Sequence, residues 1–328
     1  MSINRREALV ATVGLFVGSA CRRDTPPAPK AAVPVVGLLD AGERLEWWAA
    51  FRDELRDLGY VEDRNVAFAT RFAGGNFGRL PALAQELVRL KVAVIVTGGV
   101  AAVQEARRAT AEIPIVMGTG DDPVRLGLAS SLDHPGGNIT GVTSLSAGLP
   151  GKRLEVLLTC LPELSRLAVL WDRENVGSVS IIPHLERAAR AANVHLEDEG
   201  IRSVADLPAA FASMRRKRAQ AVLVIGSPRF FPERGRIAEL AVAHRLPSMH
   251  GTPEYVQAGG LLSYSPSYPH LFRAAALYVD KILRGAKPAE LPIGEPNRFL
   301  LAVNLKTAKG IELTVPRPLV LLADEVIE

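Results

Sequence analysis

Residues 92–103 read VAVIVTGGVAAV, a β-branched apolar run followed by two glycines and the start of a helical pattern. The apolar run has no polar interruption, so it predicts a strand that is buried on both faces, as in a parallel sheet. Residues 101–110 have the spacing of an amphipathic helix. A buried strand followed directly by a helix is the repeating unit of parallel α/β folds.

The same unit recurs on both sides of this stretch. In the first part of the chain, strands are expected at 35–39, 66–72, 92–96 and 113–117, and helices at 44–58, 80–90 and 101–110. A Gly/Pro/Asn-rich stretch, 134–141, then precedes a second series. Its strands are expected at 167–171, 194–197, 221–225 and 247–250, and its helices at 184–192, 204–217 and 233–244. The pattern predicts an α/β protein with two doubly wound parallel-sheet lobes.

The end of the chain is expected to connect the lobes again. After Gly259-Gly260 come one more predicted strand, 261–264, and a helix, 271–283, which we assign to the first lobe. The proline-rich tail is expected to cross back to the second lobe. The predicted first lobe is therefore 34–141 plus 262–286, and the predicted second lobe is 142–261 plus 287–328.

The N-terminal 33 residues predict export. Arg5-Arg6 precede an apolar run from Ala8 to Ala20, which is shorter than the roughly 20 residues of a membrane-spanning helix. Residues 1–21 are interpreted as a signal peptide and 22–33 as a linker. The arginine pair leaves the twin-arginine and general export routes open.

Cys21 follows Gly18-Ser19-Ala20, an order that indicates a bacterial lipoprotein cleavage site. We expect Cys21 to be acylated and the protein to be periplasmic, held at the membrane by this lipid anchor only. The alternative is cleavage nearby, which would leave a soluble periplasmic protein.

Composition excludes several classes of protein. Hydrophobic residues make up 48% of the 328 residues and charged residues 23%, which is typical of a globular chain rather than a disordered one. The net charge is only +4. The dense basic run at 215–218 is interpreted as the solvated end of a helix before a buried strand, so no nucleic-acid partner is expected.

No enzyme signature is evident. The sequence contains no Gly-x-Ser-x-Gly elbow, phosphate-binding Gly-x-x-x-x-Gly-Lys loop, Gly-x-Gly-x-x-Gly fingerprint or His-Glu-x-x-His helix. The six histidines lack metal-ligand spacing. Cys160 lies in an apolar helical stretch and is interpreted as a buried small hydrophobe. We expect neither catalysis, nor a metal, nor a cofactor.

Several stretches carry a more specific signal. They are FRDELRDLGY at 51–60, GDDPV at 120–124, HPGGNITG at 134–141, AGGLLSY at 258–264, NLKTAK at 304–309 and ADEVI at 323–327. Their order along residues 35–328 resembles the substrate-binding proteins of an ABC-transporter family whose members include tryptophan/tyrosine-binding components. The resemblance implies a type I periplasmic-binding fold with three crossovers between the lobes. It also implies a small-molecule ligand, an ABC permease and an ATPase subunit as partners, and we expect a monomer.

Ligands of such sheets bind beyond the carboxyl ends of the strands. Thr97-Gly98-Gly99 follows a predicted strand and opens a helix, so its amides could hold a carboxylate, unless it is simply a tight turn. The resembled family often has a hydroxyl residue where this chain has Val100, which favours backbone donors at this position.

Acidic and hydroxyl residues at the other strand ends complete the candidate ligand set. Asp122 could bind an ammonium group or cap a helix that begins near Val124. Asp172 could favour a cationic or amine-bearing ligand, or form a turn. The remaining candidates are Asp40, Ser227 and Thr252.

Aromatic residues leave a further alternative. Trp47 and Trp48 could stack on an aromatic ligand or pack into the core. The expected function is that of the extracytoplasmic solute-binding component of an ABC importer, capturing a small organic ligand such as an amino acid between two lobes. The alternative is a periplasmic sensing module that reports its ligand to a membrane signalling protein.

Overall fold

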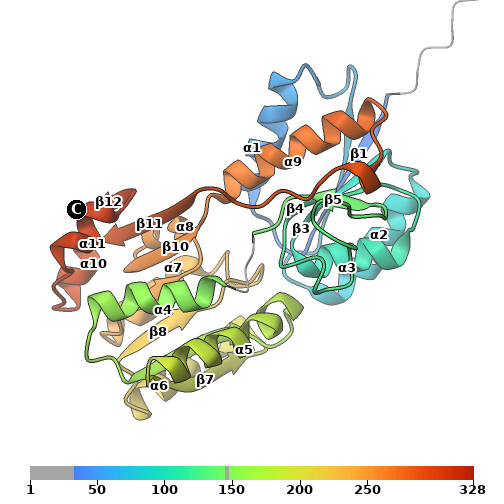
Figure 1. Ribbon diagram of the computed structural model, residues 1–328. Helices are drawn as coiled ribbons and strands as arrows, with labels where there is room; N and C mark the ends of the chain where they lie inside the picture. Colours follow the sequence, from blue (N-terminus) through green and yellow to red (C-terminus); the bar gives the residue numbers. More distant parts are fainter. Residues whose placement is uncertain (1–32, 145–147) are drawn as a thin grey trace, which may run out of the picture. The chain divides into compact units, whose positions relative to one another are not determined.

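The computed structural model describes residues 33–144 and 148–328. Cys21 and the predicted signal peptide and linker therefore lie outside the described residues, apart from Val33 at the end of the linker. The described chain forms two sheets, each covered by helices on both faces (Figure 1). This confirms the predicted α/β fold of two doubly wound lobes.

The first sheet has five strands, all parallel, in the order β2-β1-β3-β4-β5. They are β1 (Val35–Asp40), β2 (Ala67–Phe72), β3 (Val94–Gly98), β4 (Ile115–Thr119) and β5 (Ile139–Gly141). In β1, β3 and β4, successive side chains enter two different apolar clusters, one on each side of the sheet. This is why these strands read as continuous apolar runs.

Four helices cover this sheet. They are α1 (Leu45–Asp57), α2 (Leu80–Arg89), α3 (Val100–Ala109) and α9 (Tyr268–Leu283). The α1 and α9 helices pack side by side on one face, and α2 and α3 pack together on the other (Figure 1). Gly59, with φ 92°, lies just after α1, and Gly285, with φ 99°, lies just after α9, because these turns need a left-handed residue.

The second sheet has seven strands in the order β12-β11-β10-β9-β8-β6-β7. They are β6 (Arg166–Asp172), β7 (His195–Ile201), β8 (Ala221–Val224), β9 (Ser248–His250), β10 (Leu262–Pro266), β11 (Phe299–Asn304) and β12 (Glu325–Ile327). From β7 to β10 the order repeats that of the first sheet. The β10–β11 pair is antiparallel, and the other described neighbours are parallel.

The second sheet is also covered on both faces. Its helices are α4 (Leu149–Cys160), α5 (Val176–Ala191), α6 (Leu207–Arg216), α7 (Arg234–Ala243), α8 (Pro253–Gln257), α10 (Leu305–Gly310) and α11 (Arg317–Leu322). Short 3₁₀ turns occur in both lobes, at Phe77–Arg79 and Pro288–Glu290 in the first and at Val204–Asp206 in the second.

Cys160 is buried in α4, and burial raises the pKa of its thiol to about 11, in keeping with a structural role.

The chain passes between the sheets three times. The passages lie between β5 and α4, between β10 and α9, and between Gly294 and β11. The first lobe here comprises residues 33–144 and 267–294, and the second lobe residues 148–266 and 295–328.

The place of β10 corrects the predicted lobe boundary at residue 262. The sequence pattern predicts this strand in the first lobe, but Leu262 and Ser263 pair in parallel with Met249 and His250 of the second sheet. Antiparallel pairing with β11 fixes the other edge of β10. Only the helix that follows, α9, joins the first lobe, where it packs on α1 and β4.

Among the described residues, no helix combines the length and the apolar character that crossing a bilayer would require.

Candidate ligand-binding site

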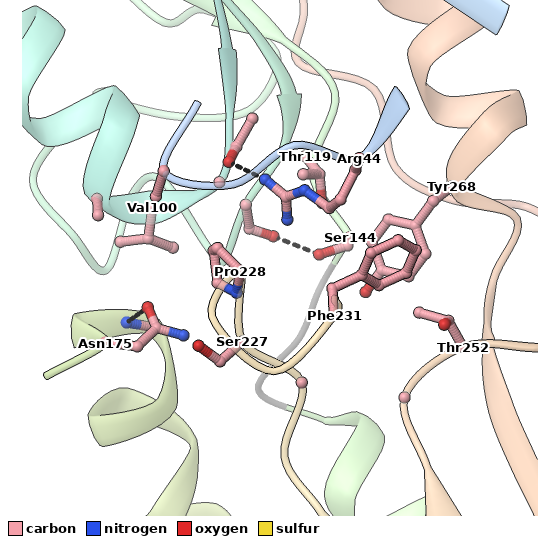
Figure 2. Close-up of a pocket in the computed structure, with 18 of the residues that line it drawn as sticks. Arg44, Val100, Thr119, Ser144, Asn175, Ser227, Pro228, Phe231, Thr252 and Tyr268 are labelled. Atoms are coloured by element: carbon pink, nitrogen blue, oxygen red, sulfur yellow. Dashed lines mark hydrogen bonds between the residues drawn. The ribbon is translucent and has the colours of Figure 1, made fainter. Parts of the chain in front are cut away.

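A cavity lies between the carboxyl ends of the two sheets. Its first-lobe wall follows β1, β3 and β4 and includes Ala41, Arg44, Gly98, Gly99, Val100, Ala101, Thr119, Gly120 and Asp121. Its second-lobe wall follows β6, β8 and β9 and includes Asn175, Gly177, Gly226, Ser227, Pro228, Gly251 and Thr252. Figure 2 shows Arg44 reaching the cavity from one side and Asn175 and Ser227 from the other. Parallel topology therefore brings side chains far apart in sequence to one place.

The turn between β3 and α3 forms one part of the wall. Gly98 and Gly99 line the cavity, and Gly99, with φ 107°, is the N-cap of α3. A Cβ at Gly98 would lie 2.2 Å from Asp40 Oδ2, so this close approach requires glycine. Thr97 is fully buried in the strand, with its hydroxyl 3.4 Å from the Val116 carbonyl, and it lies outside the lining residues.

Asp40 supports this wall from behind. Its carboxylate accepts hydrogen bonds from the Arg44 guanidinium, from Trp48 Nε1 at 3.0 Å and from the Gly42 amide at 3.0 Å. Burial raises the pKa of Asp40, while the Arg44 charge acts in the opposite direction. Asp40 is itself outside the lining, and its effect is to hold Arg44, which also donates to the Gly98 carbonyl at 2.5 Å.

Asp122 caps a turn instead of a helix. Its Oδ1 accepts the backbone N–H groups of Val124, at 2.9 Å, and Arg125, at 3.2 Å. The helix expected near Val124 is absent, because residues 123–127 form consecutive turns. Asp122 lies outside the lining, whereas its neighbour Asp121 lines the cavity and is ion-paired to Arg125.

Asp172 is buried behind the second-lobe wall. Its carboxylate accepts hydrogen bonds from Ser227 Oγ at 2.7 Å, Arg229 Nη1 at 3.2 Å and the Glu174 amide at 3.0 Å. The side chain is inaccessible to solvent and is outside the lining residues. Ser227, which Asp172 positions, does line the cavity.

Thr252 lines the cavity from the N-cap of α8. Its hydroxyl is buried and has no hydrogen-bond partner within the described chain. Of the residues proposed from the sequence, the structure thus brings Gly98, Gly99, Ser227 and Thr252 to one cavity. Asp40, Thr97, Asp122 and Asp172 lie outside its lining.

Arg153 is a lining residue that was not predicted from the sequence. It lies on α4, is 4% exposed, and donates from Nε to the Tyr264 carbonyl at 2.8 Å. Burial lowers the pKa of its guanidinium. In the part of the chain that the structure describes, no carboxylate lies within ion-pairing distance of Arg153. The available signal was its spacing, four residues from Leu149 and four from Leu157, which places a basic residue on an otherwise apolar helix face.

Aromatic rings form another part of the lining. Trp47 stacks on Tyr268, with ring centroids 4.3 Å apart and an interplanar angle of 7°, and meets the edge of Phe231 at 5.5 Å. All three line the cavity (Figure 2 labels Tyr268 and Phe231). Trp48 instead packs against Phe272 and the core. The two neighbouring tryptophans therefore divide between cavity wall and core.

Metal ligands do not gather in the described ranges. Across residues 33–144 and 148–328, no group of three or more His, Cys, Asp or Glu side chains is placed to hold a metal ion.

Comparison with known proteins places the chain in a family. A family model described as ABC transporter substrate binding protein matches residues 32–327. The chain belongs to this family. The likeness thus covers both lobes of this substrate-binding protein.

Individual relatives agree with this assignment. A tyrosine-binding protein of Clostridioides difficile (strain R20291) is 24% identical over 263 residues, covering 80% of this chain and 75% of the relative. A structure titled as an ABC domain in complex with L-Trp, from Streptococcus pneumonia, has a TM-score of 0.83 at 22% identity and covers 90% of this chain and 99% of that one. A conserved domain protein from Vibrio cholerae has a TM-score of 0.84 at 23% identity, with the same coverage. At these identities the solved structures support the fold.

Proposed function

We propose that this substrate-binding protein is the extracytoplasmic solute-binding component of an ABC importer. It captures a small organic ligand between its lobes and delivers the ligand to a membrane permease that works with an ATPase subunit. The observation that carries the proposal is the cavity between the carboxyl ends of the two sheets, with lining residues from both lobes.

The physical basis is differential contact. A ligand in this cavity contacts the first lobe through the β3–α3 turn and the second lobe through residues such as Ser227 and Thr252. Only a closed arrangement allows both sets of contacts at once, so ligand binding stabilises closure. A permease that distinguishes closed from open lobes then receives loaded protein selectively.

The ligand class to test first follows from the relatives. One binds tyrosine by its name, and one solved structure holds L-Trp. Aromatic amino acids and their analogues are therefore the first candidates, and the aromatic lining around Trp47 and Tyr268 suits a flat apolar group.

A thermal-shift screen of amino acids and small organic acids tests the proposal. A ligand present at about 100 times its Kd adds roughly 2.7 kcal/mol to the free energy of unfolding, so a true ligand raises Tm by several degrees. Deletion of the gene should then abolish uptake of that compound by cells. Normal uptake together with loss of a transcriptional response to the compound would instead support the sensing alternative.

Export and anchoring are a separate part of the proposal. The supporting observation is the order of basic residues, an apolar run and small residues that ends at Cys21. Mass spectrometry of the membrane fraction should find a mature N-terminus at Cys21 carrying lipid, and Cys21→Ala should release the protein from the membrane. An unmodified thiol at Cys21, or an intact Met1, would contradict lipid anchoring.

A further inference from the structure

The cavity lining carries an unbalanced positive charge. Among the described lining residues, the charged side chains are Arg44, Asp121 and Arg153. Arg44 is paired with Asp40, and Asp121 is paired with Arg125. Arg153 is left without a carboxylate. A buried guanidinium without a counter-charge is costly, so the site favours an anion from the ligand.

The geometry around Arg153 leaves donors available for that anion. Its Nε is bonded to the Tyr264 carbonyl, and its Nη2 is 3.4 Å from the Gly251 carbonyl, a weak contact. Nη1 has no acceptor among the described residues. Thr252, the residue after Gly251, has an unpartnered hydroxyl, and so does Tyr255 one turn further on; both line the cavity. A carboxylate accepts several hydrogen bonds at once and matches such a cluster of donors.

An ammonium group has no comparable partner. In Asp121, Oδ2 already accepts hydrogen bonds from Arg125 and from Ser180, the latter at 2.9 Å, and Oδ1 accepts the Asp122 amide at 2.9 Å. Glu254 has an unpartnered buried Oε2, but it lies outside the lining and its Oε1 is bonded to Trp47.

The rest of the lining is suited to an apolar body. Trp47, Phe77, Val100, Leu149, Ile181 and Phe231 all line the cavity. Large apolar walls with a few placed polar groups are typical of sites that bury an aromatic or aliphatic ligand. Val100 also offers methyl groups where a hydroxyl would give a further polar contact.

We infer that the ligand is an organic carboxylate with an aromatic or apolar body and no required α-ammonium group, its carboxylate held by Arg153 and Thr252. This inference rests on the proposed function, because it names the chemical class of the solute. It replaces the ammonium recognition expected at Asp122 or Asp172, which the structure places outside the lining.

Matched ligand pairs test the inference by calorimetry on the purified protein. Each pair differs only in the α-ammonium group: L-tryptophan and indolepropionate, L-tyrosine and hydroxyphenylpropionate, L-phenylalanine and phenylpropionate. Tryptamine and tyramine are the amines without a carboxylate. In the pair that binds most tightly, the propionate should bind at least as tightly as the amino acid, and the amines should not bind.

Variants assign the carboxylate to its site. Arg153→Gln and Thr252→Val should each weaken binding of the propionate, by about tenfold or more for Arg153→Gln and by about three- to tenfold for Thr252→Val. Lys152→Gln is the matched control, because Lys152 precedes Arg153 on α4, is exposed and pairs with Glu155. Glu254→Gln should not change the ratio between the members of a pair. Thr252→Val removes no hydrogen bond made within the described chain, so it reports on the site even if Arg153→Gln fails to fold.

The outcomes separate this inference from the proposed function. An amino acid that binds tenfold or more tightly than its propionate overturns the inference and leaves the proposed function standing. The inference is also overturned if Glu254→Gln changes the ratio of affinities between the amino acid and its propionate. It is overturned as well if Thr252→Val and Arg153→Gln both bind the propionate like the parent. If no compound of these pairs or of the wider screen binds, the inference and the proposed function both fail.

Discussion

Trp47 Nε1 in α1 donates a hydrogen bond to Glu254 Oε1 in α8 at 2.8 Å, and this bond joins the first lobe to the second. Two further hydrogen bonds between described residues also connect the lobes. Ser180 Oγ donates to Asp121 Oδ2 at 2.9 Å, and Arg229 Nε lies 3.3 Å from the Gly75 carbonyl. Trp47 and Asp121 also line the cavity, so two of these contacts join the lobes at the proposed ligand site.

The Trp47 contact should contribute to closure. Trp47→Phe keeps an aromatic ring but removes the N–H donor, at a cost of about 1 kcal/mol to the closed arrangement. Ligand affinity should fall by roughly fivefold, and small-angle scattering should show a larger radius of gyration without ligand. Trp171→Phe is the matched control, because its indole N–H donates to Asp198 within the second sheet, at 2.7 Å. Equal scattering and affinity for both variants would contradict a role in closure.

Gly98 should tolerate no side chain. A Cβ there would meet the Asp40 carboxylate and the Arg44 guanidinium, so Gly98→Ala should displace this ion pair and the cavity wall. The expected loss is about 1–3 kcal/mol in the free energy of unfolding, together with weaker ligand binding. Gly235→Ala is the control, because a Cβ at this α7 position has no neighbour within 4 Å and alanine favours a helix. Urea unfolding and calorimetry measure both effects, and an unchanged Gly98→Ala protein would contradict this account of the wall.

Asp172 should act on stability rather than directly on the ligand. Asp172→Asn weakens the hydrogen bonds to Ser227 and Arg229, and we expect a loss of about 2 kcal/mol in the free energy of unfolding. Asp53→Asn, which breaks an exposed pair with Arg56 on α1, should change stability by less than about 0.5 kcal/mol. Denaturant unfolding compares the two variants. An Asp172→Asn protein that is as stable as the parent but has lost ligand binding would indicate a direct contact instead.

His250 should make the protein less stable in acid. Burial, and secondarily the Arg153 charge, lowers the pKa of His250 to about 3 from an ordinary value of 6.5. Between pH 6.5 and pH 3, His250 binds a proton in the unfolded chain but stays neutral in the folded chain. Its contribution to the free energy of unfolding is therefore fully present above about pH 6.5 and is lost as pH falls towards 3.

A variant isolates this effect from the other titrating groups. His250→Phe keeps a ring against Tyr255 but has no proton to bind. Between pH 6 and pH 4, the parent should lose about 1.4 kcal/mol of unfolding free energy per pH unit more than the variant. Urea unfolding at several pH values measures this, and parallel curves for the two proteins would show that His250 is not held neutral.

Local patterns predicted the fold because each strand and helix carries its own signal. Apolar runs such as Val92–Val96 and glycines such as Gly59 are readable without tertiary information. The lobe assignment of β10 was not readable, because pairing with β9 depends on which sheet edge is free once the second lobe has formed. The sequence therefore predicts that β10 is a strand but does not predict which strand it pairs with.

Only part of the candidate site could be predicted from the sequence, because the direction of each side chain also depends on tertiary contacts. The topology places the residues that follow β1, β3, β4, β6, β8 and β9 near the cavity, but it does not say whether a side chain points into the cavity or lies behind its wall. The Asp172 side chain lies behind the wall, where it forms an ion pair with Arg229, 57 residues away in sequence. Arg153 lies on a helix that follows no strand of its own lobe, so the positions of the strand ends do not indicate it.

A crystal structure of the protein with the ligand found by the screen tests the central claim most directly. The account predicts ligand density in the cavity between the two sheets, with the carboxylate within hydrogen-bonding distance of Arg153 and with contacts to the β3–α3 turn of the other lobe. Ligand bound elsewhere, or contacts confined to one lobe, would contradict it.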